Sequence, residues 1–246
     1  MLKKAKIVGL GLLLLSIISM TGFISVERNA GQASQGAWKT QKGSLEQVLL
    51  LSDGYFMHTV FDKVNKKFVE SRGGTYTLSN DKLMVKIEFN TSNKDQIGQS
   101  LTYGFAVNKA KLSSDLSGEK AAWALLDQGK GDLAGTWRIS GRMQDGKIVM
   151  TTNRGARKTL KVLTGTRFQW AAINPETKEF FGTGGGSYTF VNGKYTENIE
   201  FFSRDNQRVG ASLSFDGKII DGNWHHSGNS STGSPIYEVW SKEPQP

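Results

Sequence analysis

Short runs of alternating apolar and polar residues fill the chain after about residue 34. In Leu83–Phe89 every second residue is apolar, and Tyr195–Phe201 repeats the alternation with Glu197 at one of the positions expected to face inward. A period of two residues is typical of a strand with one buried face. Dipeptides that favour tight turns between antiparallel strands include Asn192-Gly193, Asp216-Gly217 and Asp221-Gly222. The pattern predicts an all-β protein with little helix after the N-terminal segment.

This strand pattern occurs twice. Lys66–Leu78 matches Lys178–Phe190 at an offset of 112 residues, and the same offset pairs Ile87–Phe89 with Ile199–Phe201. Near the start of each copy, Gly36–Lys39 matches Gly135–Arg138 at an offset of only 99 residues. The second copy therefore contains an insertion of 13 residues, which we place within Gln144–Lys158.

The ends of the two copies are harder to align. Ala122–Leu125 corresponds to Ile236–Val239 in our alignment, although Glu119–Leu126 alone has the pattern of a short helix. The glycine-containing stretch Gln128–Gly131 marks the boundary between the copies. The predicted units are residues 34–128 and 131–243.

A meander of short strands hides its edges most simply by closing on itself. We therefore expect two tandem antiparallel up-and-down barrels, each able to enclose a side-chain core or one small ligand. A two-sheet sandwich is the alternative that the pattern leaves open. Trp38 and Trp137 open the first strand of each copy and are expected to plug one end of each barrel. The glycine run Gly184–Gly186 is expected to form a bend or bulge, since no helix follows it to bind phosphate.

The N-terminus has the features of a signal peptide. Lysines within Lys3–Lys6 precede the apolar run Ile7–Val26 and the small-residue stretch Gly31–Ala33. Residues 1–33 therefore predict an exported bacterial protein, periplasmic or secreted, and an uncleaved anchor is the alternative, which would be its only membrane contact. The chain has no cysteine, which excludes a lipoprotein anchor, disulfides and thiolate metal sites.

Charge changes this picture little. The whole chain carries a formal charge of +9, and without residues 1–33 it has 27 basic and 21 acidic residues. Basic residues are scattered, with short clusters only at Lys63–Lys67 and Arg154–Lys161. Nucleic-acid binding would need a concentrated basic stripe interleaved with aromatic residues. We expect no nucleic-acid partner and a solvated basic surface.

Several motifs resemble a known family. A Gly-x-Trp sequence opens each copy, and the second copy contains Gly184–Thr189, Tyr195–Phe201 and Tyr237–Trp240. These motifs resemble those of the lipocalin and calycin superfamily, and more closely those of bacterial exported lipocalin-like domains of unknown function. The Thr-Asp-Tyr motif of animal lipocalins is absent, and the basic residue that often packs on the opening tryptophan could only be Lys242. The resemblance implies a barrel with a pocket and assigns no ligand residues.

The candidate site comes from inward positions at which the copies differ. His58 is replaced by Trp170 in the second copy, and Val85 by Glu197. An inward carboxylate is costly unless it is paired or solvated, so Glu197 either reaches a basic or hydroxyl partner or lines a wet cavity. Tyr188 on the neighbouring strand is a hydroxyl that could reach it. We predict a pocket in the second barrel formed by Phe168, Trp170, Tyr188, Glu197, Phe215 and His226, within an inward aromatic set that also includes Tyr195.

Two other groups of residues are weaker candidates for a functional site. His225 and His226 are adjacent and should point to opposite faces of a strand, so we expect no metal site, and no cofactor is indicated. Glu88 and Glu200 recur at equivalent positions, which favours a shared structural role, such as a cross-strand pair with a lysine or threonine.

Three functions remain open at this point. The leading hypothesis is an exported lipocalin-like protein that binds a small, largely apolar ligand in its second barrel. The alternative is a structural or surface-interaction module with filled barrels and no small ligand. An enzyme, a hydrolase or isomerase that uses Glu197 and His226 as acid and base, is the third and is not expected.

Overall fold

The structure is a computed structural model that describes residues 35–151 and 153–244, so the expected signal peptide or anchor lies outside the described residues. The described chain is all-β apart from two 3₁₀ turns, and none of its helices is long and apolar enough to cross a membrane. The elements are β1 (Gly36–Lys42), β2 (Leu45–Ser52), β3 (Tyr55–Asp62), β4 (Lys67–Ser79), β5 (Lys82–Asn90), η1 (Lys94–Gln96), β6 (Ser100–Asn108), β7 (Lys111–Ser114), β8 (Ala121–Asp127), β9 (Gly135–Gln144), β10 (Lys147–Met150), β11 (Lys158–Leu163), β12 (Arg167–Asn174), β13 (Glu179–Val191), β14 (Lys194–Phe202), η2 (Asn206–Arg208), β15 (Ser212–Ile220), β16 (Asn223–Asn229) and β17 (Pro235–Lys242).

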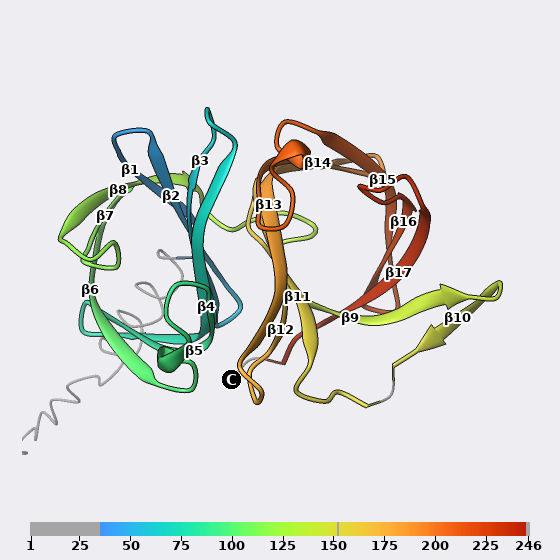
Figure 1. The fold of residues 1–246 in the computed structure, drawn as a ribbon, viewed down its shortest axis with the longest axis horizontal. Coiled ribbons are helices and arrows are strands. Elements are labelled where there is room, and N and C mark those ends of the chain that lie inside the picture. The colour runs from blue at the N-terminus through green and yellow to red at the C-terminus, as the bar shows by residue number, and fades with distance from the viewer. Residues whose placement is uncertain (1–34, 152, 245–246) are drawn as a thin grey trace, which may run out of the picture.

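Two closed antiparallel barrels follow one another along the chain (Figure 1). Barrel 1 consists of β1–β8, and barrel 2 consists of β9 and β11–β17, with β9 pairing with β17 to close it. Each strand pairs with the next one along the chain, apart from the extra strand β10. The predicted pair of up-and-down barrels is therefore confirmed, and the sandwich alternative is wrong.

The insertion in the second copy forms an extra hairpin and a loop. β1 turns into β2 across two residues, whereas β9 continues to a turn at Asp145-Gly146 and returns as β10, which pairs with the end of β9. Both turn residues have positive φ, as a type I′ hairpin requires. Figure 1 shows this hairpin projecting from barrel 2, and residues 153–157 lead back to β11.

The last strands correct two expectations. Glu119–Leu126 does not form a helix, because β8 covers most of it and closes barrel 1 against β1. Trp123 pairs with Leu112 and Trp240 pairs with Trp224, so the two tryptophans are equivalent. The alignment of Ala122–Leu125 with Ile236–Val239 is therefore three residues out of register.

A third expectation concerned a turn. Asp216-Gly217 lies inside β15, where both residues pair with β16. A Cβ at Gly217 would approach the indole nitrogen of Trp224 to 3.1 Å. Close side-chain packing, and no turn, explains this glycine.

A β-bulge in β5 reverses the alternation of its side chains. Gly74 pairs with Ile87 and Gly73 pairs with Phe89, which leaves Glu88 as the extra residue. Phe89 therefore leaves the barrel interior and packs against the other barrel, although the period of two had placed it inward.

In the equivalent bulge of β14, Glu200 is the extra residue of the strand register. Phe201 therefore also points toward the other barrel, and its expected inward position is wrong. The bulge expected at the glycine run lies here, opposite Gly185 and Gly186. A Cβ at Gly186 would lie 2.0 Å from the carbonyl oxygen of Asn198. The strands can approach this closely only because the residue is glycine.

The two barrels share an apolar interface made by outward faces of their strands. It brings β2, β3 and β5 of barrel 1 against β11, β12 and β14 of barrel 2, which lie side by side in Figure 1. Phe89 stacks on Phe180 with ring centroids 6.1 Å apart, and Phe68 lies 6.4 Å from Phe201. The offset of 112 residues converts one pair into the other, so the interface has approximate twofold symmetry.

The centre of this interface is polar and fully satisfied. Gln169 accepts a hydrogen bond from Thr59 (2.8 Å) and donates to Ser71 (2.8 Å) and Thr183 (3.0 Å). Ser71 and Thr183 are equivalent residues of the two copies. Because every member has a partner, the network fixes the relative register of the barrels without leaving a costly buried group.

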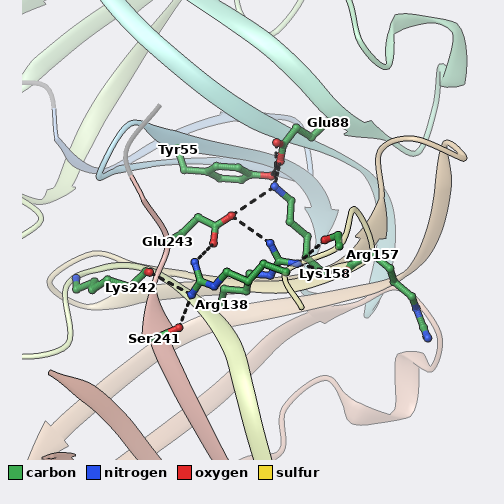
Figure 2. Close-up of polar contacts among 10 residues, drawn as sticks. Tyr55, Glu88, Arg138, Arg157, Lys158, Ser241, Lys242 and Glu243 are labelled. Atoms are coloured by element: carbon green, nitrogen blue, oxygen red, sulfur yellow. Dashed lines mark hydrogen bonds and ion pairs between the residues drawn. The ribbon is translucent and has the colours of Figure 1, made fainter. Parts of the chain in front are cut away.

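Reciprocal ion pairs lie at the edges of the interface. Glu88 of barrel 1 accepts from Tyr55 of its own barrel and from Lys158 of barrel 2 at 2.8 Å, as Figure 2 shows. Glu200 of barrel 2 accepts from Arg167 of its own barrel and from Lys63 of barrel 1 at 3.2 Å. The shared structural role predicted for these glutamates is confirmed. The bridging lysine, however, comes from the other barrel, not from a neighbouring strand.

We predict that the two lysines differ in their contribution to stability. Lys158→Met should lower the free energy of unfolding by about 3 kcal/mol, because the Lys158 side chain is only 10% exposed and its loss leaves the Glu88 carboxylate without its cation. Lys63→Met should cost less than about 1 kcal/mol, because Lys63 is 52% exposed and Glu200 keeps Arg167. Urea denaturation of both variants measures the difference, and equal losses would contradict the burial argument.

Candidate functional site

A buried ion pair occupies the interior of barrel 2. Lys161 on β11 contacts Glu197 on β14 at 2.8 Å, and both side chains are only 6% exposed. The offset of 112 residues places Leu49 and Val85 at these positions in barrel 1, where they belong to the apolar core. Barrel 2 has therefore exchanged an apolar contact for two opposite charges.

Aromatic rings surround the ammonium group of Lys161. Its nitrogen lies between 5.1 and 5.9 Å from four ring centroids, those of Phe168, Tyr195, Trp224 and Trp240. Contacts of this kind attract a cation through the ring quadrupoles, most strongly where water is excluded. The rings and Glu197 together replace the hydration that Lys161 loses on burial.

Glu197 faces inward, as predicted, and has both a basic and a hydroxyl partner, but the hydroxyl is not that of Tyr188. Tyr188 lies directly opposite Glu197 in the strand register, yet its hydroxyl donates to the Thr164 carbonyl at 2.6 Å. The hydroxyl of Tyr195 donates to Glu197 instead, at 2.9 Å. Burial, and then the Glu197 carboxylate, raise the pKa of Tyr195 well above its usual value of 10. Tyr195 is therefore a permanent donor to this carboxylate.

His226 is the second titratable group of the interior. It is 2% exposed and its ring packs 4.1 Å from that of Phe215, whereas His225 points outward to Tyr237, so the expected opposite faces are confirmed. Its Nδ1 lies 3.7 Å from the carboxylate of Glu238, beyond hydrogen-bond distance, and neither ring nitrogen has a hydrogen-bond partner among the described residues. Burial lowers the pKa of His226 below 6.5, against the opposing effect of Glu238. The ring is therefore neutral at pH 7.

These groups border a cavity of about 300 Å³ in barrel 2. Four residues of the predicted pocket line it: Trp170, Glu197, Phe215 and His226. Phe168 and Tyr188 are buried in the same core and are not among its lining residues. The lining residues that the sequence did not suggest include Lys161, Ile199, Leu213, Glu238 and Trp240.

A comparison of the copies could have found Lys161. It falls in the basic cluster Arg154–Lys161, which predicts solvated charges, but Lys161 is buried and the Lys158 side chain is only 10% exposed. Alignment with Leu49 shows the exchange that places a lysine inside the barrel. Glu238 could not be found in this way, because the last strands had been aligned three residues out of register.

In barrel 1 the corresponding positions carry different side chains. Arg72, which replaces Gly184 of barrel 2, donates to the hydroxyl of Tyr103 at 3.1 Å and to the Leu116 carbonyl. His58, at the position of Trp170, packs edge-on against Trp123 at 5.7 Å. The two interiors therefore differ in chemistry.

The described residues contain no group of three or more histidine, aspartate or glutamate side chains that could hold a metal ion. We compared the chain with models of protein families and with curated proteins, and neither comparison gave a match. The chemistry of the site must therefore be argued from its geometry alone.

We predict that the buried ion pair can be exchanged as a unit. Glu197→Val should lower the free energy of unfolding by about 3 to 5 kcal/mol, because it leaves Lys161 charged and buried without its carboxylate. The double variant with Lys161→Leu restores the apolar pair of barrel 1 and should recover most of that loss. Guanidinium denaturation tests this, and a double variant less stable than Glu197→Val would refute it.

We also predict a loss of stability in mild acid. Because the folded pKa of His226 lies below its unfolded value, the unfolded chain binds a proton first as the pH falls below about 6.5. His58, whose pKa burial and Arg72 lower well below 6.5, acts in the same direction. Each contributes a slope of up to about 1.4 kcal/mol per pH unit until its folded pKa is reached. NMR titration of the two imidazoles, with midpoints expected below 6.5, provides the check, and a higher midpoint for His226 would contradict it.

Proposed function

We propose that the protein is an exported, lipocalin-like binding protein whose second barrel holds a small, largely apolar ligand. The cavity of about 300 Å³ is the observation that carries this proposal. Ligand pockets of proteins begin at about this volume and combine apolar walls with a few polar groups. The size favours a ligand of one or two rings or a short chain.

The polar groups of the cavity favour a ligand with one hydrogen-bonding group. The His226 nitrogens and the indole N–H of Trp240 are buried and lack hydrogen-bond partners among the described residues. Unsatisfied buried groups cost about 1 to 3 kcal/mol each, which a ligand hydroxyl or carbonyl would recover. Lys161 and Glu197 neutralise one another, so they add polarity to the wall without demanding a charged ligand at this point.

A packing detail supports the lipocalin-like assignment. The ammonium of Lys242 lies 4.4 Å from the ring of Trp137 and donates to the Ala134 carbonyl at 2.8 Å. This is the contact between a closing basic residue and the opening tryptophan that the resemblance implies. In barrel 1 the register partner of Trp38 is the apolar residue Leu125, at the position that Lys242 occupies in barrel 2.

The alternative, a structural module with filled barrels, fits barrel 1 better than barrel 2. An acid–base role for Glu197 with His226 has less support, because Lys161 and Tyr195 occupy one oxygen of Glu197. The carboxylate within 4 Å of His226 is Glu238, and its pairing with Arg142 suits a structural role as well.

We predict that the fluorescent apolar probe N-phenyl-1-naphthylamine binds with saturation at one site. Leu213→Trp should weaken binding at least tenfold, because the larger side chain fills the cavity that Leu213 lines. Leu101→Trp is the matched control, since Leu101 is the equivalent residue of barrel 1 and should leave binding unchanged. Fluorescence titration measures both. If the wild-type protein shows no saturable change, the binding function is wrong.

A further inference from the structure

A second hollow lies beside the cavity, between the insertion and the strands of barrel 2. This cleft has a volume of about 430 Å³ and takes its walls from β9, β11, β12 and β13 together with residues 153–157. Its lining includes no aspartate or glutamate. The basic side chains that line it are Arg138, Arg142, Arg154, Arg157, Lys158 and Arg204.

Four of these six cations already have carboxylate partners. Glu243 lies within 3.7 Å of Arg138 and 3.3 Å of Arg154, Glu88 pairs with Lys158, and Glu238 pairs with Arg142. Figure 2 shows the network around Glu243 and Glu88, with the Arg157 side chain pointing away from it. For Arg157 and Arg204, no described carboxylate lies within ion-pair distance. Three glutamates therefore face six cations, and the cleft keeps a net positive charge.

The two unpaired arginines are exposed, and each lies against a residue of β13. The guanidinium of Arg157 lies 4.5 Å above the ring of Phe181. The side chain of Arg204 lies close to Gly182, where a Cβ would come within 2.9 Å of its Nε. Arginine presents a planar set of donors that matches the oxygens of phosphate, sulfate and carboxylate groups. Two guanidinium groups without carboxylate partners among the described residues therefore line the same cleft.

The cleft and the cavity are adjacent, and both are lined by Thr159 and Trp170. Barrel 1 lacks this arrangement, because it has no insertion and has Ser92 and Val69 at the positions of Arg204 and Phe181. We infer that the ligand is an anionic amphiphile, with its apolar part in barrel 2 and its oxyanion head against Arg157 and Arg204. This inference rests on the proposed function, since it places the tail in the same cavity.

Three probes separate the contributions of head and tail in isothermal titration calorimetry on the full chain. Octyl phosphate has both parts, octan-1-ol has only the tail, and inorganic phosphate has only the head. We expect octyl phosphate to bind at least tenfold more tightly than either of the others. In the variant Arg157→Ala/Arg204→Ala this advantage over octan-1-ol should fall to threefold or less. The variant Lys109→Ala/Lys111→Ala, which removes two charges from barrel 1, should retain the full advantage.

Each other outcome has a definite meaning. Equal binding of octyl phosphate and octan-1-ol by the wild-type protein would overturn the inference and leave the proposed function standing. A preference for octyl phosphate that survives the loss of both arginines would also overturn it, because the head would then be bound elsewhere. If inorganic phosphate binds as tightly as octyl phosphate and octan-1-ol does not bind, the cleft takes free anions, and both the amphiphile and the apolar-ligand function fail.

Discussion

A strand of a closed barrel must send alternate side chains inward and outward, and the architecture of this protein depends on where that rule is broken. The bulges at Glu88 and Glu200 shift the alternation by one residue in equivalent strands. Before the bulge each strand supplies its own barrel core, and after it Phe89 and Phe201 supply the interface. The same β-bulge, which lies opposite two glycines in each copy, therefore provides the aromatic residues that join the two barrels.

The pairing of the barrels explains why some strands hide their period. Every residue of β3 is buried, because one face packs inside barrel 1 and the other packs against barrel 2. Its sequence, Tyr55–Asp62, consequently has no alternation, as expected for a strand covered on both faces. The interface also excludes water around Lys158 and Glu88, so that charges which would be weak on a surface become structural contacts.

The sequence was sufficient to predict the repeat, the barrels and the inward acid, because period, turn dipeptides and constant register are local properties. It was insufficient where the answer depended on a partner far along the chain. The predicted alternation was correct from Leu83 to Ile87, but the bulge that follows turned Phe89 outward. Tyr188 lay opposite Glu197 as expected, but Lys161 reached that carboxylate from β11 across the barrel interior. Strand patterns define which face a residue occupies, but not which side chain meets it there.

The two barrels differ in how their interiors affect stability. Barrel 1 keeps an apolar interior with Leu49 and Val85, and such a core is the larger source of folding free energy. Barrel 2 carries a buried lysine, two buried glutamates and a cavity, all of which cost stability unless they are compensated. Because the interface makes the outer face of barrel 2 part of a shared core, barrel 1 contributes to holding barrel 2 closed. Duplication thus allowed one barrel to accept buried charges and a cavity while the other kept an apolar core.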